Sequence, residues 1–259
     1  STPKPSSAAS DVYKRQSLKE IGLGLFGTSW YPGRGEFGLL PMIFGSFYVT
    51  ILSLVMAVPL GVGCAVFLSE LAPPSIRGII RRGVELLVGI PSVVYGLIGM
   101  VLLVPFIREV FGVGSGSSVL AASIVLTVMI LPTIISISED SIRAVPLSYR
   151  EAALSLGATR WQMIRTVVLP SAKVGIMTSV ALGMGRAIGE TMAMIMVIGN
   201  SPIISLSPLN PARTLTGNIA VEIKAAVGIH ESSLFATALI LLILVLFLNS
   251  IAFTVRGRR

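Results

Sequence analysis

The sequence has little of the chemistry on which soluble enzymes depend. Its 259 residues include one cysteine, Cys64, and one histidine, His230. These counts rule out an intrachain disulfide and argue against a histidine- or cysteine-based metal centre and against a hydrolytic triad. No G-x-x-x-x-G-K-[ST] phosphate loop occurs, so we expect no ATP binding of that kind. We therefore expect a chain that is not an enzyme and carries no cofactor, and any ATP-driven work must be powered by another subunit.

Charged residues are also scarce. They make up 12% of the chain, whereas hydrophobic residues make up 53% and the mean hydropathy is +0.87. Soluble domains carry about 25% charged residues, so we expect an integral membrane protein surrounded by lipid. The net charge of +8 does not indicate nucleic acid. The basic residues form no patch interleaved with aromatic residues and lie instead in loops between apolar runs.

Five apolar runs are long enough to cross a bilayer as helices. They cover approximately Ile43–Phe67, Val84–Ile107, Val119–Ser136, Val174–Ile198 and Leu234–Val255. Nothing shows the alternating pattern of a membrane β-barrel, so the predicted fold class is all-α, a polytopic membrane helix bundle. One proline lies inside each of the first three runs and is expected to kink it.

Basic residues predict the orientation. They gather in the Leu71–Gly83 loop, the Ile137–Lys173 loop and the C-terminal tail, and they are rare in the two other loops. By the positive-inside rule, these three segments are cytoplasmic, which places the chain in the cytoplasmic (inner) membrane of a prokaryote. The segment before the first run conflicts with this rule, because it is basic and yet would lie outside. We therefore expect that a preceding span is missing.

The same conflict suggests two domains. We expect residues 1–38 to be a polar or interfacial segment, partly disordered or foreign to the membrane domain. Residues 39–259 are expected to form that domain, with a cytoplasmic coupling loop at 137–173.

Two charges, Arg186 and Glu190, lie in the middle of the fourth run. A charge at the centre of a membrane helix costs about 2.5–3.5 kcal/mol on insertion scales. At a spacing of four residues the two side chains share one helical face and can pair. One reading is a structural ion pair between helices. The reading that we favour is an anion pathway, in which Arg186 is the attracting charge. Small residues at the same spacing, Gly185 and Gly189 among them, are expected to serve helix packing.

The longest cytoplasmic loop shows strong helix punctuation. Ser148 and Glu151 form the pattern of a capping box, and Gly157 can end that helix in the left-handed conformation. A second box begins at Thr159, and its helix is expected to end at Leu169–Pro170. The two helices are either interfacial or a rigid knob that docks into a partner.

This loop resembles the E-A-A-x3-G-x9-I-x-L-P signature of ABC importer permeases. The matching residues are Glu151, Ala152, Ala153, Gly157, Leu169 and Pro170, and Val167 stands at the isoleucine position. In that family the loop is the coupling helix that fits a cleft on the cytoplasmic ATPase. The resemblance implies the type I ABC importer permease fold and ATPase-coupling roles for the matching residues.

A second resemblance narrows the family. G-R-A-I-G-E-T-M-A-M at residues 185–194 and E-L-L-V-G-I-P-S-V-V-Y-G at residues 85–96 are similar to the PstC-like phosphate importer permeases. That family has six spans, and the resemblance leads us to expect that the first of them is missing here. The resemblance implies phosphate import with a PstA-like second permease, two ATP-binding subunits and an extracytoplasmic phosphate-binding protein. Two alternatives stay open: a permease for another oxyanion or solute, and a phosphate-sensing membrane scaffold.

Overall fold

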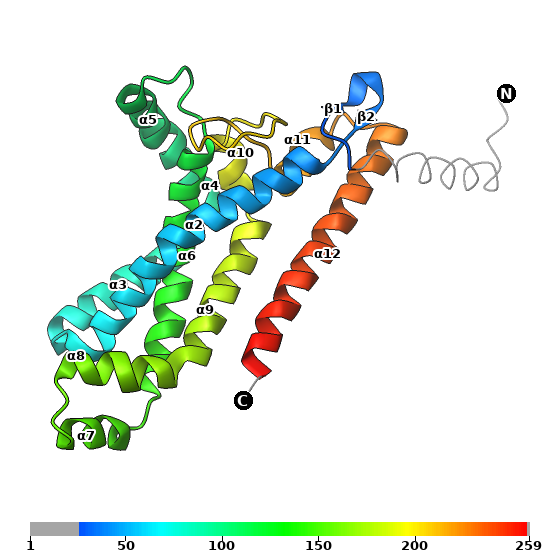
Figure 1. Cartoon of the computed structure of the whole chain (residues 1–259). Helices are drawn as coiled ribbons and strands as arrows, with labels where there is room; N and C mark the ends of the chain where they lie inside the picture. The colour runs from blue at the N-terminus through cyan, green and yellow to red at the C-terminus, as the bar shows by residue number, and fades with distance from the viewer. Residues whose placement is uncertain (1–25, 258–259) are drawn as a thin grey trace, which may run out of the picture.

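The computed structural model describes residues 26–257 as a bundle of long helices with one small hairpin (Figure 1). The hairpin pairs β1 (Trp30–Tyr31) with antiparallel β2 (Glu36–Phe37) through a 3-10 turn at Pro32–Arg34. The predicted N-terminal segment falls largely on residues 1–25, which lie outside the described residues. The all-α membrane fold is confirmed from α2 onward.

Five stretches are long and apolar enough to cross a membrane, which agrees with the number predicted. The elements that form them are α2 (Leu40–Val66) with the π-turn η2 (Phe67–Leu71); α4 (Ser92–Ile98), η3 (Gly99–Leu103) and α5 (Val104–Phe111); α6 (Val119–Arg143); α8 (Arg160–Met163), η4 (Ile164–Val168) and α9 (Leu169–Gly189); and α12 (Ile229–Gly257). Large apolar side chains point outward from them, as Leu239, Leu242 and Leu246 of α12 do. Lipid solvates such a surface at no cost, whereas water would not.

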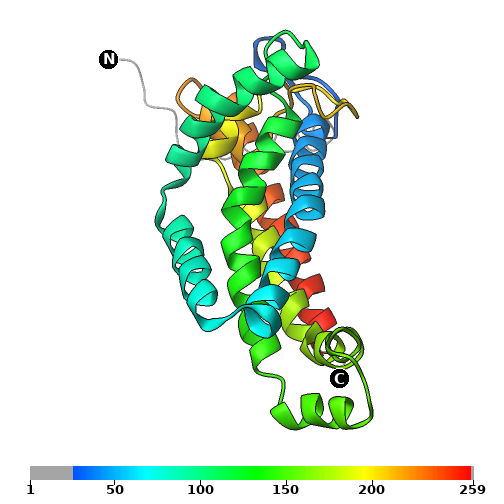
Figure 2. The same ribbon diagram turned by 90° about the vertical axis from the view of Figure 1, so that its left-hand side faces the viewer.

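Two helices, α2 and α6, run side by side along the bundle, and α9 packs along α6 (Figures 1 and 2). Buried hydroxyl groups bridge them: Thr127 of α6 donates to the carbonyl of Ser53 at 3.2 Å, and Ser138 lies 2.8 Å from Ser179 of α9. A side chain at Gly175 of α9 would collide with Ser141 of α6. The helices therefore approach closely through small residues, as membrane helices commonly do.

The second predicted span, Val84–Ile107, is wrong at its start, because the helix is broken rather than kinked. An amphipathic helix, α3 (Pro74–Gly89), ends before Ile90, which is extended at φ −76° and ψ 125°, and α4 begins only after Pro91. Proline has no amide hydrogen and disfavours a helical residue before it. Beyond the break, α4 packs on the short helix α10 (Met192–Val197), where a Cβ at Gly96 would lie 2.8 Å from Cα of Ala193.

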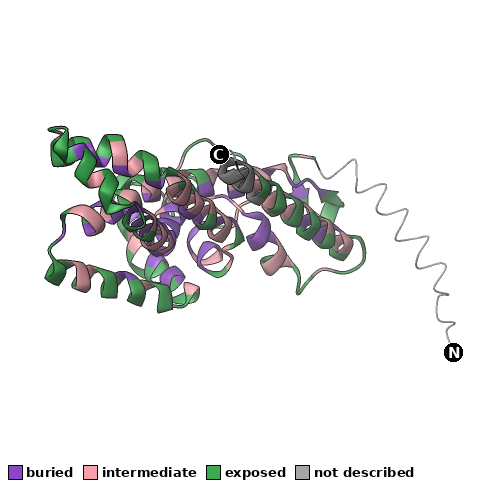
Figure 3. Ribbon diagram, turned by 90° about the horizontal axis from the view of Figure 1, so that it is seen from below, coloured by how far each residue is buried: buried purple, intermediate pink, exposed green. Residues whose placement is uncertain are grey.

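The two ends of the bundle carry different elements, and the basic segments lie toward one of them. The hairpin, α10 and α11 (Leu215–Glu222) lie at one end, and α7 (Leu147–Ser155) and α8 lie at the other (Figure 1). The loop between α2 and α3, the loop between α6 and α9, and the end of α12 all lie toward the α7 end, so the three basic segments are on one side (Figure 1). Buried residues gather toward the middle of the molecule, and exposed ones lie along its outer helices (Figure 3).

Candidate functional site

The fourth span is not the continuous helix that we predicted over Val174–Ile198. The helix α9 ends at Gly189, Glu190 is extended at φ −69° and ψ 129°, and α10 then begins at Met192. The Glu190 carboxylate accepts a hydrogen bond from the amide of Ala193 at 3.1 Å. It thereby satisfies one of the free amide groups at the start of α10. Arg186 consequently lies in the last turn of α9 and not at the midpoint of a span.

The ion pair of Arg186 with Glu190, one of the two readings of the sequence, does not form among residues 26–257. Glu190 serves α10, and its carbonyl accepts a hydrogen bond from the hydroxyl of Thr216 at 3.0 Å. Arg186 is partly buried, and among residues 26–257 it makes no hydrogen bond or ion pair. The partial negative charge at the end of α9 favours a cation there. The guanidinium donors of Arg186 are therefore available to an anion, which they can bind in a two-pronged geometry.

Residues from three neighbouring elements surround Glu190. They include the hydroxyl residues Ser46 and Thr50 of α2 and Thr214 before α11, together with the apolar Met194 of α10. Two of these hydroxyls also fix the start of α11, because Ser46 accepts from the amide of Leu215 at 2.9 Å and Thr214 accepts from that of Gly217 at 3.0 Å. Non-helical backbone at membrane depth requires such support from neighbouring protein.

The two glycines predicted to serve helix packing lie on the last turns of α9. Gly189 is exposed, and a Cβ built there would have no neighbour within 4 Å among the described residues. Close approaches on α9 occur at Gly175 and at Gly183, the latter against Ile134 of α6. Packing roles for Gly185 and Gly189 stay predictions.

The coupling loop begins with a helix that is capped differently from expectation. The Ser148 box is wrong, because α7 starts at Leu147 after Pro146 and has no side-chain cap. Its end agrees with the prediction, since Gly157 has φ +85°. The amide of Gly157 donates to the carbonyl of Leu154 at 2.9 Å, and that of Ala158 donates to Ala153 at 3.2 Å. These two bonds are the Schellman arrangement that ends a helix sharply.

The second helix of the loop starts as predicted and continues further. Thr159 and Gln162 form both bonds of a capping box. The helix does not end at Leu169–Pro170 but runs on through the π-turn η4 into α9. The amide of Leu169 bonds to the carbonyl of Ile164 in a wider turn. Such a turn, together with a proline, bends a helix without ending it, and α9 rises from α8 at an angle in Figure 1.

The E-A-A residues split between surface and core. Glu151 and Ala152 are exposed, whereas Ala153 is buried against a cluster that includes Val145 and Met163. The surface around them is rich in large apolar side chains, namely Leu147, Tyr149, Leu154, Leu156 and Trp161. Leu156 is 89% exposed, so almost the whole residue is available for contact with a partner. A surface of this kind marks an interaction site.

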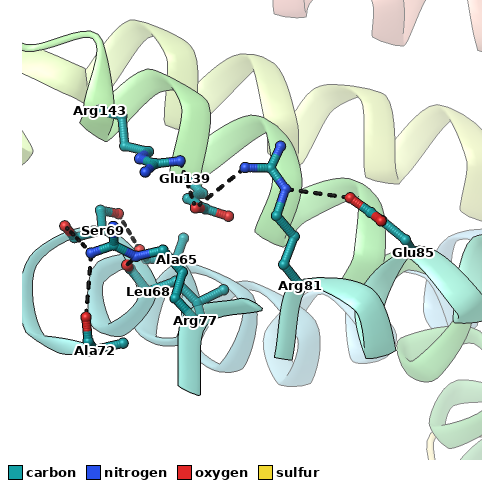
Figure 4. A network of polar contacts seen from close by, with 9 residues as sticks. All are labelled: Ala65, Leu68, Ser69, Ala72, Arg77, Arg81, Glu85, Glu139 and Arg143. Carbon is teal, nitrogen blue, oxygen red and sulfur yellow. Dashed lines mark hydrogen bonds and ion pairs between the residues drawn. The ribbon is translucent and has the colours of Figure 1, made fainter. Parts of the chain in front are cut away.

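Sequence reasoning missed ion pairs at this end that involve glutamates with little exposure. Glu139 of α6, 3% exposed, lies 3.4 Å from Arg143 and 3.9 Å from Arg81 of α3, and Arg81 also pairs with Glu85 at 3.3 Å (Figure 4). A second pair joins Arg150 of α7 to Glu70 at 2.9 Å. The signal was present in the sequence, since both glutamates lie at the ends of apolar runs.

Another buried cluster lies at the opposite end. Arg213 pairs with Glu222 at 2.7 Å and donates to the carbonyl of Asn200 at 2.8 Å. His230 lies 3.1 Å from Glu222 and stacks on Phe37 of the hairpin. The cluster fixes the loop before α11 to the start of α12.

Comparisons with known proteins agree with this geometry. Residues 57–258 match the family described as the binding-protein-dependent transport system inner membrane component. The probable ABC transporter permease YqgH of Bacillus subtilis is 47% identical over 85% of this chain and 72% of its own length. The phosphate transport system permease PstC of Mesorhizobium japonicum is 39% identical over 92% of this chain and 79% of its own length.

Solved structures agree on the fold. The MetNI methionine ABC transporter has a chain that matches with a TM-score of 0.65 at 20% identity, over 85% of this chain and 96% of that one. An ABC transporter involved in the import of alginate matches with a TM-score of 0.63 at 17% identity, over 93% of this chain and 90% of that one.

Five spans, a broken fourth span and an exposed E-A-A helix define a membrane transport component with the type I ABC importer permease fold. The chain belongs to the family of binding-protein-dependent transport system inner membrane components. Its resemblance to the PstC permeases is confirmed by relatives of that name at 34–39% identity.

Proposed function

We propose that the chain is the permease subunit of an ATP-driven importer that moves inorganic phosphate across the inner membrane of a prokaryote. The observation that carries the proposal is Arg186, whose guanidinium makes no hydrogen bond or ion pair within residues 26–257 and lies at a break in a membrane helix. Ionisable residues in this position usually line a path or a cavity. The phosphate transport permeases among the relatives support phosphate as the anion.

The chemistry follows from what each charge faces. Arg186 presents planar paired donors that suit phosphate oxygens better than the point charge of a lysine. Glu190 is held nearby by its bond to the amide of Ala193 and does not neutralise Arg186. Its negative charge lowers the affinity of Arg186 for an anion, because like charges repel over this range. An anion attracted to the site is thus released again rather than trapped.

The rest of the machine is supplied by partners. We propose a PstA-like permease beside this chain, two ATP-binding subunits at the α7 end and an extracytoplasmic phosphate-binding protein at the hairpin end. Glu151, Ala152 and the exposed Leu156 form the surface that meets an ATPase, and Ala153 anchors α7 to the bundle. Gly157, Leu169 and Pro170 set the direction of the two helices around this surface.

The test is uptake by the full complex reconstituted in vesicles with ATP at the ATPase side. Labelled phosphate is expected to accumulate only when ATP and the binding protein are present. Excess sulfate or molybdate should compete poorly. If another oxyanion were taken up equally well, phosphate would not be the specific substrate. Phosphate-dependent signalling without uptake would establish the sensing scaffold instead.

The proposed orientation predicts a labelling pattern. Ser155 of α7 and Ser207 of the loop after α10 are both exposed but belong to opposite ends. With Cys64 replaced by alanine, a membrane-impermeant maleimide added to intact cells should label Ser207→Cys and miss Ser155→Cys. Both should react after the cells are opened. Labelling of Ser155→Cys from outside would invert the topology.

A further inference from the structure

We propose that Arg150 is the residue that ties the coupling helix α7 to the first and third spans, so that a displacement of α7 by the ATPase moves their inner ends. This inference rests on the proposed function, since it assigns a positioning role within the transport cycle. Arg150 follows Tyr149 and precedes the E-A-A triplet, and it faces the bundle rather than the docking surface: its side chain is only 15% exposed.

The first contact of Arg150 is to Glu70 in η2, the π-turn that ends the first span. Its Nη2 lies 2.9 Å from Oε1 of Glu70 and its Nε lies 3.3 Å from the same oxygen. The Glu70 side chain is 9% exposed. Removing one member of such a pair leaves the other charge buried without compensation, which is far more costly than losing an exposed pair.

The second contact of Arg150 is to the end of α6. Its Nη2 donates to the carbonyl of Ile142 at 2.9 Å, and its Nη1 donates to the carbonyl of Val145. Ile142 lies in the last turn of α6 and Val145 just beyond it. Carbonyls at the end of a helix lack their regular helical partners, and a cation is favoured there. One guanidinium therefore connects α7, the first span and the third span.

The turn η2 passes the connection onward to α3. Arg77 of α3 donates from Nε to the carbonyl of Leu68 at 2.7 Å and from Nη2 to that of Ala72 at 3.3 Å (Figure 4). Arg77 therefore binds the backbone of η2, the same turn whose Glu70 carboxylate pairs with Arg150. Movement of this turn carries α3 with it, and π-turns inside helices are frequent at functional sites.

Packing gives α7 an apolar connection as well. Its main helix contacts are with η4 and α8, which lead into α9, and Ala153 belongs to an apolar cluster that includes Ala65 and Val66 at the end of α2. Apolar contacts between packed helices allow small sliding movements, whereas the pair of Arg150 with Glu70 fixes the position of α7 against the first span. Without Arg150, α7 would keep its apolar packing and lose its polar link to the first span. The structure therefore predicts loss of coupling rather than loss of folding when the link is removed.

The experiment compares ATP hydrolysis with phosphate import in the reconstituted complex. Arg150→Gln is expected to raise the number of ATP molecules hydrolysed per phosphate imported roughly tenfold or more, in line with the loss of a charge-assisted bond. Arg82→Gln is the matched control, because Arg82 is exposed at the same end and, among residues 26–257, donates only to the carbonyl of Gly78 in its own helix. The control should leave the ratio unchanged.

A second variant keeps the test decisive if Arg150→Gln assembles poorly. The double variant Arg150→Gln with Glu70→Gln leaves no buried unpaired charge, so it should assemble and remain uncoupled. Normal coupling in a well-assembled double variant would overturn the inference.

A distance measurement separates this inference from the proposed function, because it needs no substrate. Spin labels at Leu71→Cys and Leu154→Cys, in a Cys64→Ala background, report the spacing of η2 and α7. We expect the same narrow distribution with and without ATP in the parent complex, and a broad one in Arg150→Gln. A narrow distribution in both the parent complex and Arg150→Gln would refute the link, even if the parent complex imports phosphate. A broad distribution in Arg150→Gln, together with no phosphate uptake by the parent complex, would refute only phosphate as the substrate.

Discussion

Replacing Arg186 by glutamine is expected to reduce phosphate uptake roughly 10- to 100-fold, the range that corresponds to losing one charge-assisted hydrogen-bonding partner. The complex should still assemble, because Arg186 makes no hydrogen bond or ion pair within residues 26–257 that folding would lose. Arg186→Lys keeps the charge but lacks the planar fork, so its uptake should lie between those of the parent and Arg186→Gln. The measurement is labelled phosphate uptake, with the amount of complex in the membrane determined in parallel.

The double variant with Glu190→Gln distinguishes a path from a structural pair. A glutamine at position 190 retains an oxygen that can accept from the amide of Ala193, so the start of α10 is preserved. If Arg186 only balanced Glu190, removing both charges would restore uptake. We expect uptake to stay low. Arg108→Gln is the control, because Arg108 is an exposed arginine in the last turn of α5, and this variant should transport normally. Normal uptake by a well-expressed Arg186→Gln variant would exclude the anion path.

Replacing Gly157 by valine is expected to abolish most of the ATP hydrolysis that substrate stimulates. Gly157 has φ +85°, and a Cβ there would meet nothing within 4 Å among the described residues. The cost is therefore conformational, about 1–3 kcal/mol for a residue held in a rare backbone region. Valine would shift the end of α7 and turn the docking surface away from the ATPase, while the five spans remain intact.

Asparagine is the matched control at this position, because it tolerates the left-handed conformation. Gly157→Asn should retain most of the stimulation. Glu151→Lys tests the surface itself, since Glu151 is exposed and its charge would be reversed without disturbing α7; weakened binding of the ATP-binding subunits is expected. Equal stimulation in the valine and asparagine variants would show that the direction of α7 does not matter.

The features that the sequence predicted correctly depend on short-range interactions. The second capping box joins Thr159 to Gln162, and Gly157 ends α7 through bonds to residues a few positions away. The number of spans follows from hydropathy alone. The Ser148 box failed although it is local, because α7 already starts at Leu147, after Pro146. The other features that were missed depend on distant contacts: the break at Glu190 is supported by Thr216, 26 residues away, and Arg150 binds Glu70 across 80 residues. Proline at position 91 was recognised, but whether it kinks or breaks a helix depends on what its neighbours can bond.

The two breaks, at Ile90–Pro91 and at Glu190, let the chain change direction inside the membrane domain at low energetic cost. Turning the backbone at Glu190 changes the angle between α9 and α10 without opening a hydrogen bond inside either helix, whereas bending a continuous helix by the same angle would disrupt several of them. Beyond the breaks, α4 and α10 are locked together where Gly96 meets Ala193. The outer half therefore holds α4 and α10 as one packed unit, whose direction relative to α3 and α9 is set by the backbone geometry at the two breaks.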